Sequence, residues 1–448
     1  MQEILAGPGS GLAGPGCRER GLADRYNGPM DASHSDVLIL GGGVVGLSCA
    51  LYALQHGAHV RVLEQGTPGC GSSHGNCGTI TPSHAAPLAM PGTLAIALRS
   101  VFRADAPLYL NPRLDGARLR WLLGFARHCN WQDFERAAQA RAAILLRSRQ
   151  LIGEWIGREK LDCEFVESGV MYVYRQPGPM VADEHHHTTL LERLGIPVQR
   201  LRGDEVEAME PALKPGVKGG LLHPGDARLR PDRYVAELAR LVRERGGVIE
   251  TGARIERFDT EGRRIVRVGT NRGDFAGDRV LLALGAWSPL LGSKLGLRLP
   301  MQPGKGYSLT YTRPSLAPRN ALVLRDVSVC VTTWDSGFRL GSTMEFSGYA
   351  EGLNRTRIDA LRRGAAEGLR EPEGPRLQEE WWGWRPMSVD EVPIIGPSTR
   401  WSNLHLATAH GMLGVSMSAA TGELVAAQLS GTTPAFDPAP YAPARFGL

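Results

Sequence analysis

The chain lacks both a long apolar run and a cysteine pattern of a known kind. No stretch of about 18 or more consecutive apolar residues occurs in its 448 residues, which excludes a transmembrane helix. The seven cysteines are widely separated and include no Cys-x-x-Cys pair, so we expect neither a disulfide framework nor a zinc clip. Because scattered free thiols are typical of a reducing compartment, the sequence predicts a cytoplasmic protein.

Lysine is scarce, and the charge is nearly balanced. Only five of the 51 basic residues are lysines, and 46 acidic residues leave a formal net charge of +5. These charges are dispersed, without a basic run interleaved with aromatics, which argues against nucleic-acid binding. Apolar residues make up 42% of the chain, near the globular norm, so its length predicts two or three compact domains.

The first 33 residues lack the basic start and apolar core of a secretory signal. They are rich in glycine and proline, and we interpret them as a flexible N-terminal extension. Met30 stands directly before the first regular segment. Translation from Met30 and a genuine tail beginning at Met1 are therefore equal alternatives.

A strand–turn–helix–strand pattern follows the extension. Residues 36–40 form a short apolar run that is typical of a strand buried on both faces. The sequence GGGVVG occupies positions 41–46, and apolar residues then recur at helical spacing to Leu54. Residues 59–64 return as a second strand. The pattern predicts a βαβ unit.

The glycines of this unit have separate roles. Gly41 allows a tight turn, Gly43 lets the backbone approach a pyrophosphate, and Gly46 lets the helix pack on the strand. Glu64 ends the second strand, where a carboxylate accepts hydrogen bonds from ribose hydroxyls and disfavours a 2′-phosphate. These features predict an unphosphorylated dinucleotide, either FAD or NAD.

The remaining chain alternates in character. Residues 84–224 mix helix-like and strand-like stretches, and we interpret them as a separate layer inserted into the first domain. Residues 300–384 look rich in strands. Outside these two segments, the periodicity predicts strands that rejoin the first sheet and a closing helix. The expected elements are helices over 118–134, 137–160, 231–245 and 415–429, and strands over 170–174, 248–250, 279–283, 307–311, 328–333, 338–341 and 404–407.

Four further motifs carry a family resemblance. They are GSSHGNCG at 71–78, KGYSLT at 305–310, WGWRPM at 382–387 with PIIG at 393–396, and HGMLG at 410–414. With these motifs, the chain from Asp36 to about Gly431 resembles the FAD-dependent amino-acid oxidoreductases of the D-amino-acid oxidase superfamily, most closely the bacterial D-amino-acid dehydrogenases.

The resemblance implies FAD as the cofactor and an α/β fold of two parts. A discontinuous, Rossmann-like FAD-binding domain is expected from residues 34–83, 225–299 and 385–431. A β-rich α+β substrate-binding domain over the isoalloxazine ring is expected from 84–224 and 300–384. Residues 432–448 remain as a C-terminal tail.

Several segments are expected to hold the cofactor. The 71–78 loop, rich in small residues, can pass close to a flat ring, although a plain surface turn is the alternative. The helix start at 410–414 would direct its positive dipole at the flavin N1 and C2 carbonyl, although simple packing is the alternative. The expected cofactor-binding residues are Gly41, Gly43, Val45, Gly46, Glu64, Gln65, Ser72, Ser73, His74, Asn76, Cys77, Gly78, Ala253, Gly285, Trp287, His410, Gly411, Met412, Leu413 and Gly414.

Two residues are expected to act on the substrate. The guanidinium fork of Arg385 can grip a carboxylate with two hydrogen bonds, and the resemblance places a carboxylate-binding arginine there. Tyr307 can donate its hydroxyl to the same carboxylate or to the imine product. An ordinary surface arginine and a buried structural tyrosine are the respective alternatives.

Other reactive residues receive simpler interpretations. Some relatives bond FAD to a histidine in the loop that holds His74, but that histidine aligns with Gly75, so we expect noncovalent binding. Cys70 and Cys77 are interpreted as structural thiols. The adjacent histidines at 185–187 point in different directions, and we expect no metal site.

The reaction implied is hydride transfer from the α-carbon of an amino or imino acid to flavin N5. A D-amino acid, including D-proline or hydroxy-D-proline, is favoured over its L-isomer. The electrons are expected to pass to a quinone or other respiratory acceptor, with peripheral contact at the inner face of the cytoplasmic membrane. The alternatives are an oxygen-using glycine, sarcosine or D-amino-acid oxidase, a non-catalytic flavin-binding subunit of a larger complex, and an NAD-dependent dehydrogenase.

Overall fold

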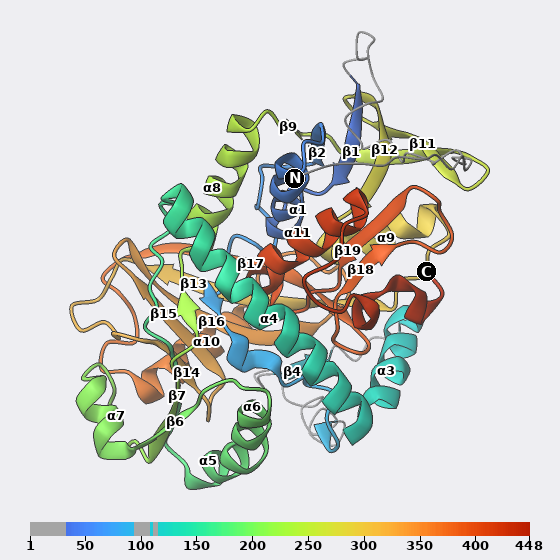
Figure 1. The fold of residues 1–448 in the computed structure, drawn as a ribbon. Coiled ribbons are helices and arrows are strands. Elements are labelled where there is room, and N and C mark those ends of the chain that lie inside the picture. Colours follow the sequence, from blue (N-terminus) through green and yellow to red (C-terminus); the bar gives the residue numbers. More distant parts are fainter. Residues whose placement is uncertain (1–32, 94–107, 111–114) are drawn as a thin grey trace, which may run out of the picture.

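The computed structural model describes residues 33–93, 108–110 and 115–448, which build two large sheets and the helices around them (Figure 1). Almost all of the expected N-terminal extension, including Met30, lies outside the described residues.

The first sheet contains the predicted βαβ unit at its centre. Five of its strands run parallel in the order β9-β2-β1-β12-β19, so the strands expected near 248 and 279 do rejoin it. Antiparallel strands extend the sheet beside β12 and β19. Its members are β1 (His34–Leu40), β2 (Val60–Glu64), β9 (Val248–Thr251), β10 (Ile255–Glu261), β11 (Arg264–Thr270), β12 (Gly273–Leu282), β18 (Ile394–Pro397) and β19 (Leu404–Thr408).

Four helices cover this sheet and share one apolar core. They are α1 (Val44–Gln55), α4 (Trp131–Glu159), α8 (Pro231–Glu244) and α11 (Gly414–Ser430). Helix α4 comes from the segment interpreted as a separate layer, yet its buried face packs against α11 and contributes Ile144, Leu145 and Ile152 to the core. Residues 84–224, interpreted as a separate layer inserted into the first domain, therefore include a helix whose apolar stripe is buried against that domain.

The helix expected over 118–134 is in fact interrupted. Helix α3 (Gly116–His128) ends two residues before α4 begins. Between them the side chain of Asn130 accepts a hydrogen bond of 3.0 Å from the Asp133 amide and caps α4. Asparagine is a preferred N-cap residue, and this local bond outweighs the continuous helical periodicity.

The second sheet confirms that residues 300–384 are rich in strands. Its order is β17-β13-β16-β15-β14-β5-β7-β6, with β4 beside β16. Strand β17 runs on to Ser388 and so crosses the domain boundary expected at 385. The members are β4 (Leu108–Leu110), β5 (Val170–Tyr174), β6 (Gln199–Arg202), β7 (Gly219–His223), β13 (Met301–Tyr311), β14 (Ala321–Leu324), β15 (Val329–Trp334), β16 (Gly337–Phe346) and β17 (Leu377–Ser388).

One face of the second sheet is closed and the other is turned toward the first domain. Helix α10 (Arg355–Gly368) packs its Ile358 and Leu361 against Tyr307 and Leu309 of β13. The opposite face carries Arg385. Shorter elements complete the described chain: β3 (Thr79–Ile80), β8 (Ala227–Arg228), α5 (Pro177–Asp183), α6 (Thr189–Arg193), α7 (Gly203–Met209), α9 (Ser288–Lys294) and short turns at Pro82–Ala85, Glu184–Thr188, Gly285–Trp287, Ala439–Tyr441 and Pro443–Phe446.

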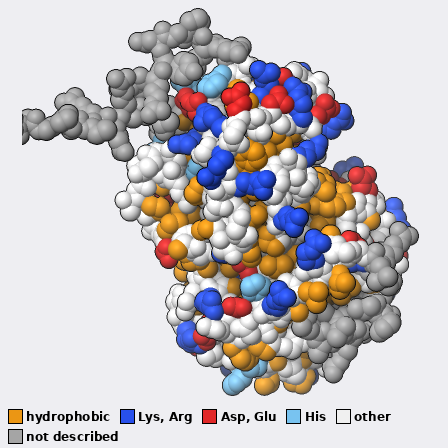
Figure 2. Space-filling model, turned by 90° about the vertical axis from the view of Figure 1, so that its right-hand side faces the viewer, with side chains coloured by type: hydrophobic (Ala, Val, Ile, Leu, Met, Phe, Trp, Pro, Cys, Tyr) orange, Lys and Arg blue, Asp and Glu red, His pale blue; other side chains and the backbone are white. Residues whose placement is uncertain are grey.

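The C-terminal residues 432–448 fold back over the first domain. The buried Tyr441 hydroxyl donates a hydrogen bond of 2.6 Å to the Ala140 carbonyl, and Arg445 pairs with Asp390 at 2.8 Å. Figure 2 shows basic side chains scattered over one face of the molecule, several of them beside acidic ones, in keeping with the dispersed charge of the sequence.

Candidate active site

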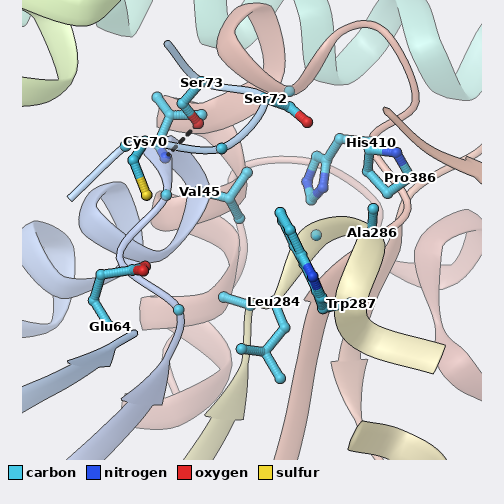
Figure 3. Close-up of a pocket in the computed structure, with 18 of the residues that line it drawn as sticks. Val45, Glu64, Cys70, Ser72, Ser73, Leu284, Ala286, Trp287, Pro386 and His410 are labelled. Atoms are coloured by element: carbon cyan, nitrogen blue, oxygen red, sulfur yellow. Dashed lines mark hydrogen bonds between the residues drawn. The ribbon is translucent and has the colours of Figure 1, made fainter. Parts of the chain in front are cut away.

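A cavity of about 360 Å³ lies where the two sheets meet. It opens beyond the carboxyl ends of β1, β2 and β12, which is where doubly wound α/β sheets bind their ligands. Residues from both sheets line it, among them Glu64 of β2 and Arg385 of β17. Figure 3 shows Trp287 standing between the Glu64 side of the cavity and His410.

The glycine turn after β1 has the geometry that its motif predicts. Gly41 has a φ of +108°, and a Cβ there would lie 2.5 Å from the Ala283 carbonyl oxygen. A Cβ on Gly46 would lie 2.0 Å from the Gly41 oxygen, so this glycine permits close packing. At Gly43 a Cβ would approach only the Ser73 hydroxyl, at 3.5 Å. The chain is therefore open at Gly43, where a pyrophosphate would approach.

Two long helices begin at the cavity without a side-chain cap of their own. The N-cap residues of α1 and α11 are Gly43 and Leu413, neither of which bonds the helix through its side chain. The amide of Val44, the first residue of α1, donates a hydrogen bond to the Ser73 hydroxyl at 3.1 Å (Figure 3). Because helix N-termini attract anions, both ends suit a ligand that carries phosphates and an anionic ring.

Glu64 is held at the end of β2 by its neighbours. One carboxylate oxygen accepts a hydrogen bond of 2.8 Å from the Gly42 amide, and the other accepts one of 2.8 Å from the Gly66 amide. Both bonds fix the side chain beside the glycine turn, on the cavity lining. This position fits the predicted contact with a ribose.

His410 opens the turn that leads into α11. Burial lowers the pKa of this side chain to about 3, so its ring is neutral at physiological pH. Its Nε2 lies 3.0 Å from the Thr421 hydroxyl. The next residue, Gly411, has a φ of +57° and donates its amide to the Pro386 carbonyl at 3.0 Å. The turn is thereby tied to β17 next to Arg385.

Arg385 is a cavity-lining cation without a carboxylate partner among the described residues. Its Nη1 donates to the Thr343 carbonyl at 2.7 Å, and its guanidinium lies over Gly306, where a Cβ would clash at 2.3 Å. Burial lowers the pKa of Arg385, but an arginine stays charged. A buried guanidinium that lacks an ion pair is suited to an anionic ligand.

Tyr307 does not join Arg385. It pairs with Trp382 across the β13–β17 ladder. Trp382 lies an odd number of residues from Arg385, so the side chain of Tyr307 is on the opposite face of the sheet. There it is buried, and its hydroxyl donates to Glu345 at 2.8 Å. The structure thus places Tyr307 in the core beneath α10, away from the cavity lining.

His74 also points away from the cavity. Its Nε2 lies 2.7 Å from Oε1 of Glu379, and this contact lowers the pKa of Glu379. The neighbouring Gly75 packs against Trp381, since a Cβ there would lie 1.9 Å from the indole ring. The position that aligns with a FAD-linking histidine therefore has no room for a side chain.

Most of the expected cofactor residues do line the cavity. Besides His74, four expected residues lie off the lining: Gly46, Cys77, Gly78 and Leu413. They belong to the same turns as the lining residues, but they contact the backbone of neighbouring segments or the second sheet. The expected residues on the lining are Gly41, Gly43, Val45, Glu64, Gln65, Ser72, Ser73, Asn76, Ala253, Gly285, Trp287, His410, Gly411, Met412 and Gly414.

Sequence reasoning missed several lining residues. Arg254 follows the carboxyl end of β9, and that position at the edge of a parallel sheet is a signal that could have identified it. Trp381 and Pro386 belong to the same tryptophan-rich stretch as Arg385, so their place in that stretch is a signal that could have identified them. The other residues missed are Val44, Leu63, Gly69, Cys70, Gly71, Ile255, Ala283, Leu284, Ala286, Leu290, Leu291, Ala407 and Val415.

Neither a metal-binding cluster nor a membrane-spanning helix is present among the described residues. No group of three or more His, Cys, Asp or Glu side chains in the described ranges is arranged to hold a metal ion. No helix in that part of the chain combines the length and the apolar character needed to cross a bilayer.

Comparison with known proteins assigns the chain to a family. Residues 36–428 match the family described as DAO, FAD dependent oxidoreductase. A D-amino acid dehydrogenase of Granulibacter bethesdensis is 33% identical over 419 residues, which cover 92% of this chain and 99% of that protein. A D-amino acid dehydrogenase of Rhizorhabdus wittichii is 34% identical over 417 residues, which cover 90% and 97%.

The fold comparison agrees. The crystal structure of glycine oxidase from Geobacillus kaustophilus superimposes with a TM-score of 0.74 at 23% identity, covering 92% of this chain and 98% of that one. This likeness confirms the two-part α/β fold. The open glycine turn, the fixed Glu64 and the two uncapped helix starts fit FAD at the cavity. The chain belongs to the DAO family of FAD-dependent oxidoreductases.

Proposed function

We propose that this protein is a dehydrogenase of D-amino acids, including D-proline or hydroxy-D-proline. The observation that carries the proposal is Arg385, a cavity-lining guanidinium with no carboxylate partner among the described residues. A substrate carboxylate supplies the missing anion. The D-configuration is supported by the relatives named D-amino acid dehydrogenase, which match nearly all of this chain.

Arg385 sets the position of the substrate. Its fork binds the carboxylate with two hydrogen bonds, while the bond from Nη1 to the Thr343 carbonyl keeps the guanidinium from turning. FAD, when bound, supplies a two-electron acceptor for the hydride that leaves the α-carbon. Orientation of the C–H bond is the main contribution of the protein to the rate.

A general base is not part of this proposal. Among the described lining residues near Arg385, His410 is the one imidazole, and it is buried, neutral and placed beside Thr421. The substrate therefore reacts as its neutral amine, whose lone pair assists hydride departure. The imine product hydrolyses to a keto acid, or stays cyclic when the substrate is proline-like.

The electron acceptor is proposed to be a quinone or another respiratory carrier, met at the inner face of the cytoplasmic membrane. This step follows the dehydrogenase name of the relatives. The competing account is an oxidase that passes its electrons to oxygen.

Product stoichiometry separates the two accounts. The holoenzyme is given a D-amino acid in air, with and without a soluble quinone, and hydrogen peroxide is measured against keto acid. We expect keto acid to form with the quinone and little peroxide to appear. One peroxide per keto acid without quinone would support the oxidase. Turnover of L-amino acids alone would overturn the proposed stereochemistry.

A further inference from the structure

Two cysteines that are far apart in the sequence meet behind the cavity. Cys77 belongs to the 71–78 loop, and Cys330 lies on β15 of the second sheet. The Cys77 sulfur lies 2.6 Å from the place that a Cβ on Gly341 would occupy, and Gly341 is the direct cross-strand partner of Cys330. Both cysteines are free thiols, and each is the leading influence on the pKa of the other.

The loop that carries Cys77 is fixed over this sheet. The buried Arg339 donates one hydrogen bond of 3.1 Å to the His74 carbonyl and one of 2.8 Å to the Asn76 carbonyl. Its Nε also donates to the Thr310 hydroxyl at 2.9 Å. These bonds hold the backbone directly before Cys77 against the second sheet.

The surroundings make the two thiols unequal. The hydrogen bond from Cys330 lowers the pKa of Cys77, and the charges of Arg385 and Arg339 lower it further, against the effect of burial. The same contact, together with burial, raises the pKa of Cys330 well above its usual range. Because the thiolate is the attacking form of a cysteine, these directions favour Cys77 as the attacking sulfur and Cys330 as its partner.

We propose that Cys77 and Cys330 form an oxidation site, at which hydrogen peroxide converts the two thiols into a disulfide between the cavity loop and the second sheet. The Cys77 sulfur attacks one peroxide oxygen, the O–O bond breaks, and water leaves after protonation. The Cys330 sulfur then attacks the resulting sulfenic acid and displaces a second water. Two thiols lose two hydrogens and two electrons, and one peroxide becomes two waters.

This site goes beyond the proposed dehydrogenation and does not depend on it. The disulfide would tie the loop that bears Ser72 and Ser73, both on the cavity lining, to β15. Because a cross-link between distant residues restricts the unfolded chain, the oxidised protein should melt at a higher temperature than the reduced one.

The test uses full-length holoenzyme that has been reduced and then treated with one equivalent of hydrogen peroxide. We expect a mass loss of about 2 Da, a linked peptide pair containing Cys77 and Cys330, and a raised melting temperature, all reversed by dithiothreitol. Cys330→Ser should abolish the linked pair and leave Cys77 as a sulfenic acid that dimedone traps. Cys129→Ser, a matched control outside the loop and the cavity lining, should leave the cross-link unchanged.

The outcome that overturns the inference is equally definite. If Cys77 and Cys330 remain free thiols while other cysteines are oxidised, or if dimedone fails to label Cys77 in a folded Cys330→Ser protein, the site is wrong. No substrate turnover enters these readouts. A failure here therefore leaves the proposed dehydrogenase activity untouched, and loss of that activity would not remove the cross-link.

Discussion

Replacement of Arg385 by alanine removes the group that we expect to hold the substrate carboxylate. The variant also loses the bond from Nη1 to the Thr343 carbonyl, but this bond is to backbone and its loss leaves no charge unpaired in the free enzyme. The fold should therefore survive, and FAD should stay bound, because the glycine turn and the two helix starts are unchanged.

The size of the effect follows from the bonds lost. Each hydrogen bond to a charged group contributes about 1.5–3 kcal/mol, so a bidentate pair contributes about 3 kcal/mol or more. Since about 1.4 kcal/mol corresponds to a factor of ten, the Michaelis constant should rise about 100-fold or more. Arg385→Lys keeps the charge without the fork, so its Michaelis constant should lie between those of the unmodified protein and Arg385→Ala.

Steady-state kinetics with an artificial electron acceptor measure the effect, and flavin absorbance per chain measures cofactor occupancy. Arg141→Ala is the matched control, since Arg141 is a buried arginine that is paired with Glu391 outside the cavity lining. It should lower the melting temperature without changing the Michaelis constant. If Arg385→Ala retains FAD and changes the Michaelis constant by less than about threefold, Arg385 does not bind the carboxylate.

Four other substitutions test separate parts of the account. Gly43→Ala should fold normally but bind FAD at least about tenfold more weakly. Gly46→Ala should fold poorly, because its Cβ would lie 2.0 Å from a backbone oxygen. Thermal melts and flavin titration distinguish the two variants. Tyr307→Phe removes the hydrogen bond to the Glu345 carboxylate and should cost about 1.5–3 kcal/mol in denaturant unfolding. It should leave the Michaelis constant unchanged, and a large rise in that constant would return Tyr307 to the substrate site. Burial lowers the pKa of His223 to about 2, so below pH 6.5 this histidine takes up a proton in the unfolded chain but not in the folded one, and stability falls as the pH falls. His223→Leu should reduce the loss in free energy of unfolding between pH 7 and pH 5 by about 2 kcal/mol. An unchanged dependence of that free energy on pH would contradict this.

The sequence allowed the local parts of the site to be predicted. The βαβ unit follows from apolar periodicity and three glycines, and the structure confirms the strands, the helix and the position of Glu64. Arg385 was found from its motif and does line the cavity. In each case the signal lies within a short stretch of sequence, where periodicity and turn chemistry act directly.

The parts that failed depend on contacts between distant segments. Tyr307 of β13 lies close to Arg385 of β17 along the paired strands, but the register of the two strands places its side chain on the face opposite to Arg385. A single sequence does not reveal a strand register. The approach of Cys77 to Cys330 likewise depends on how a loop of the first domain lies over the second sheet. The packing of helix α4 on α11 is hidden from a single sequence for the same reason, since α11 lies near the other end of the chain.

The most direct test of the central claim is the absorbance of the purified protein under anaerobic conditions. We predict about one flavin per chain, with a spectrum that is bleached when a D-amino acid is added and unchanged by the corresponding amine that lacks the carboxylate. A protein that holds no flavin and takes none up on reconstitution would contradict the account, and so would a bound flavin that no D-amino acid reduces.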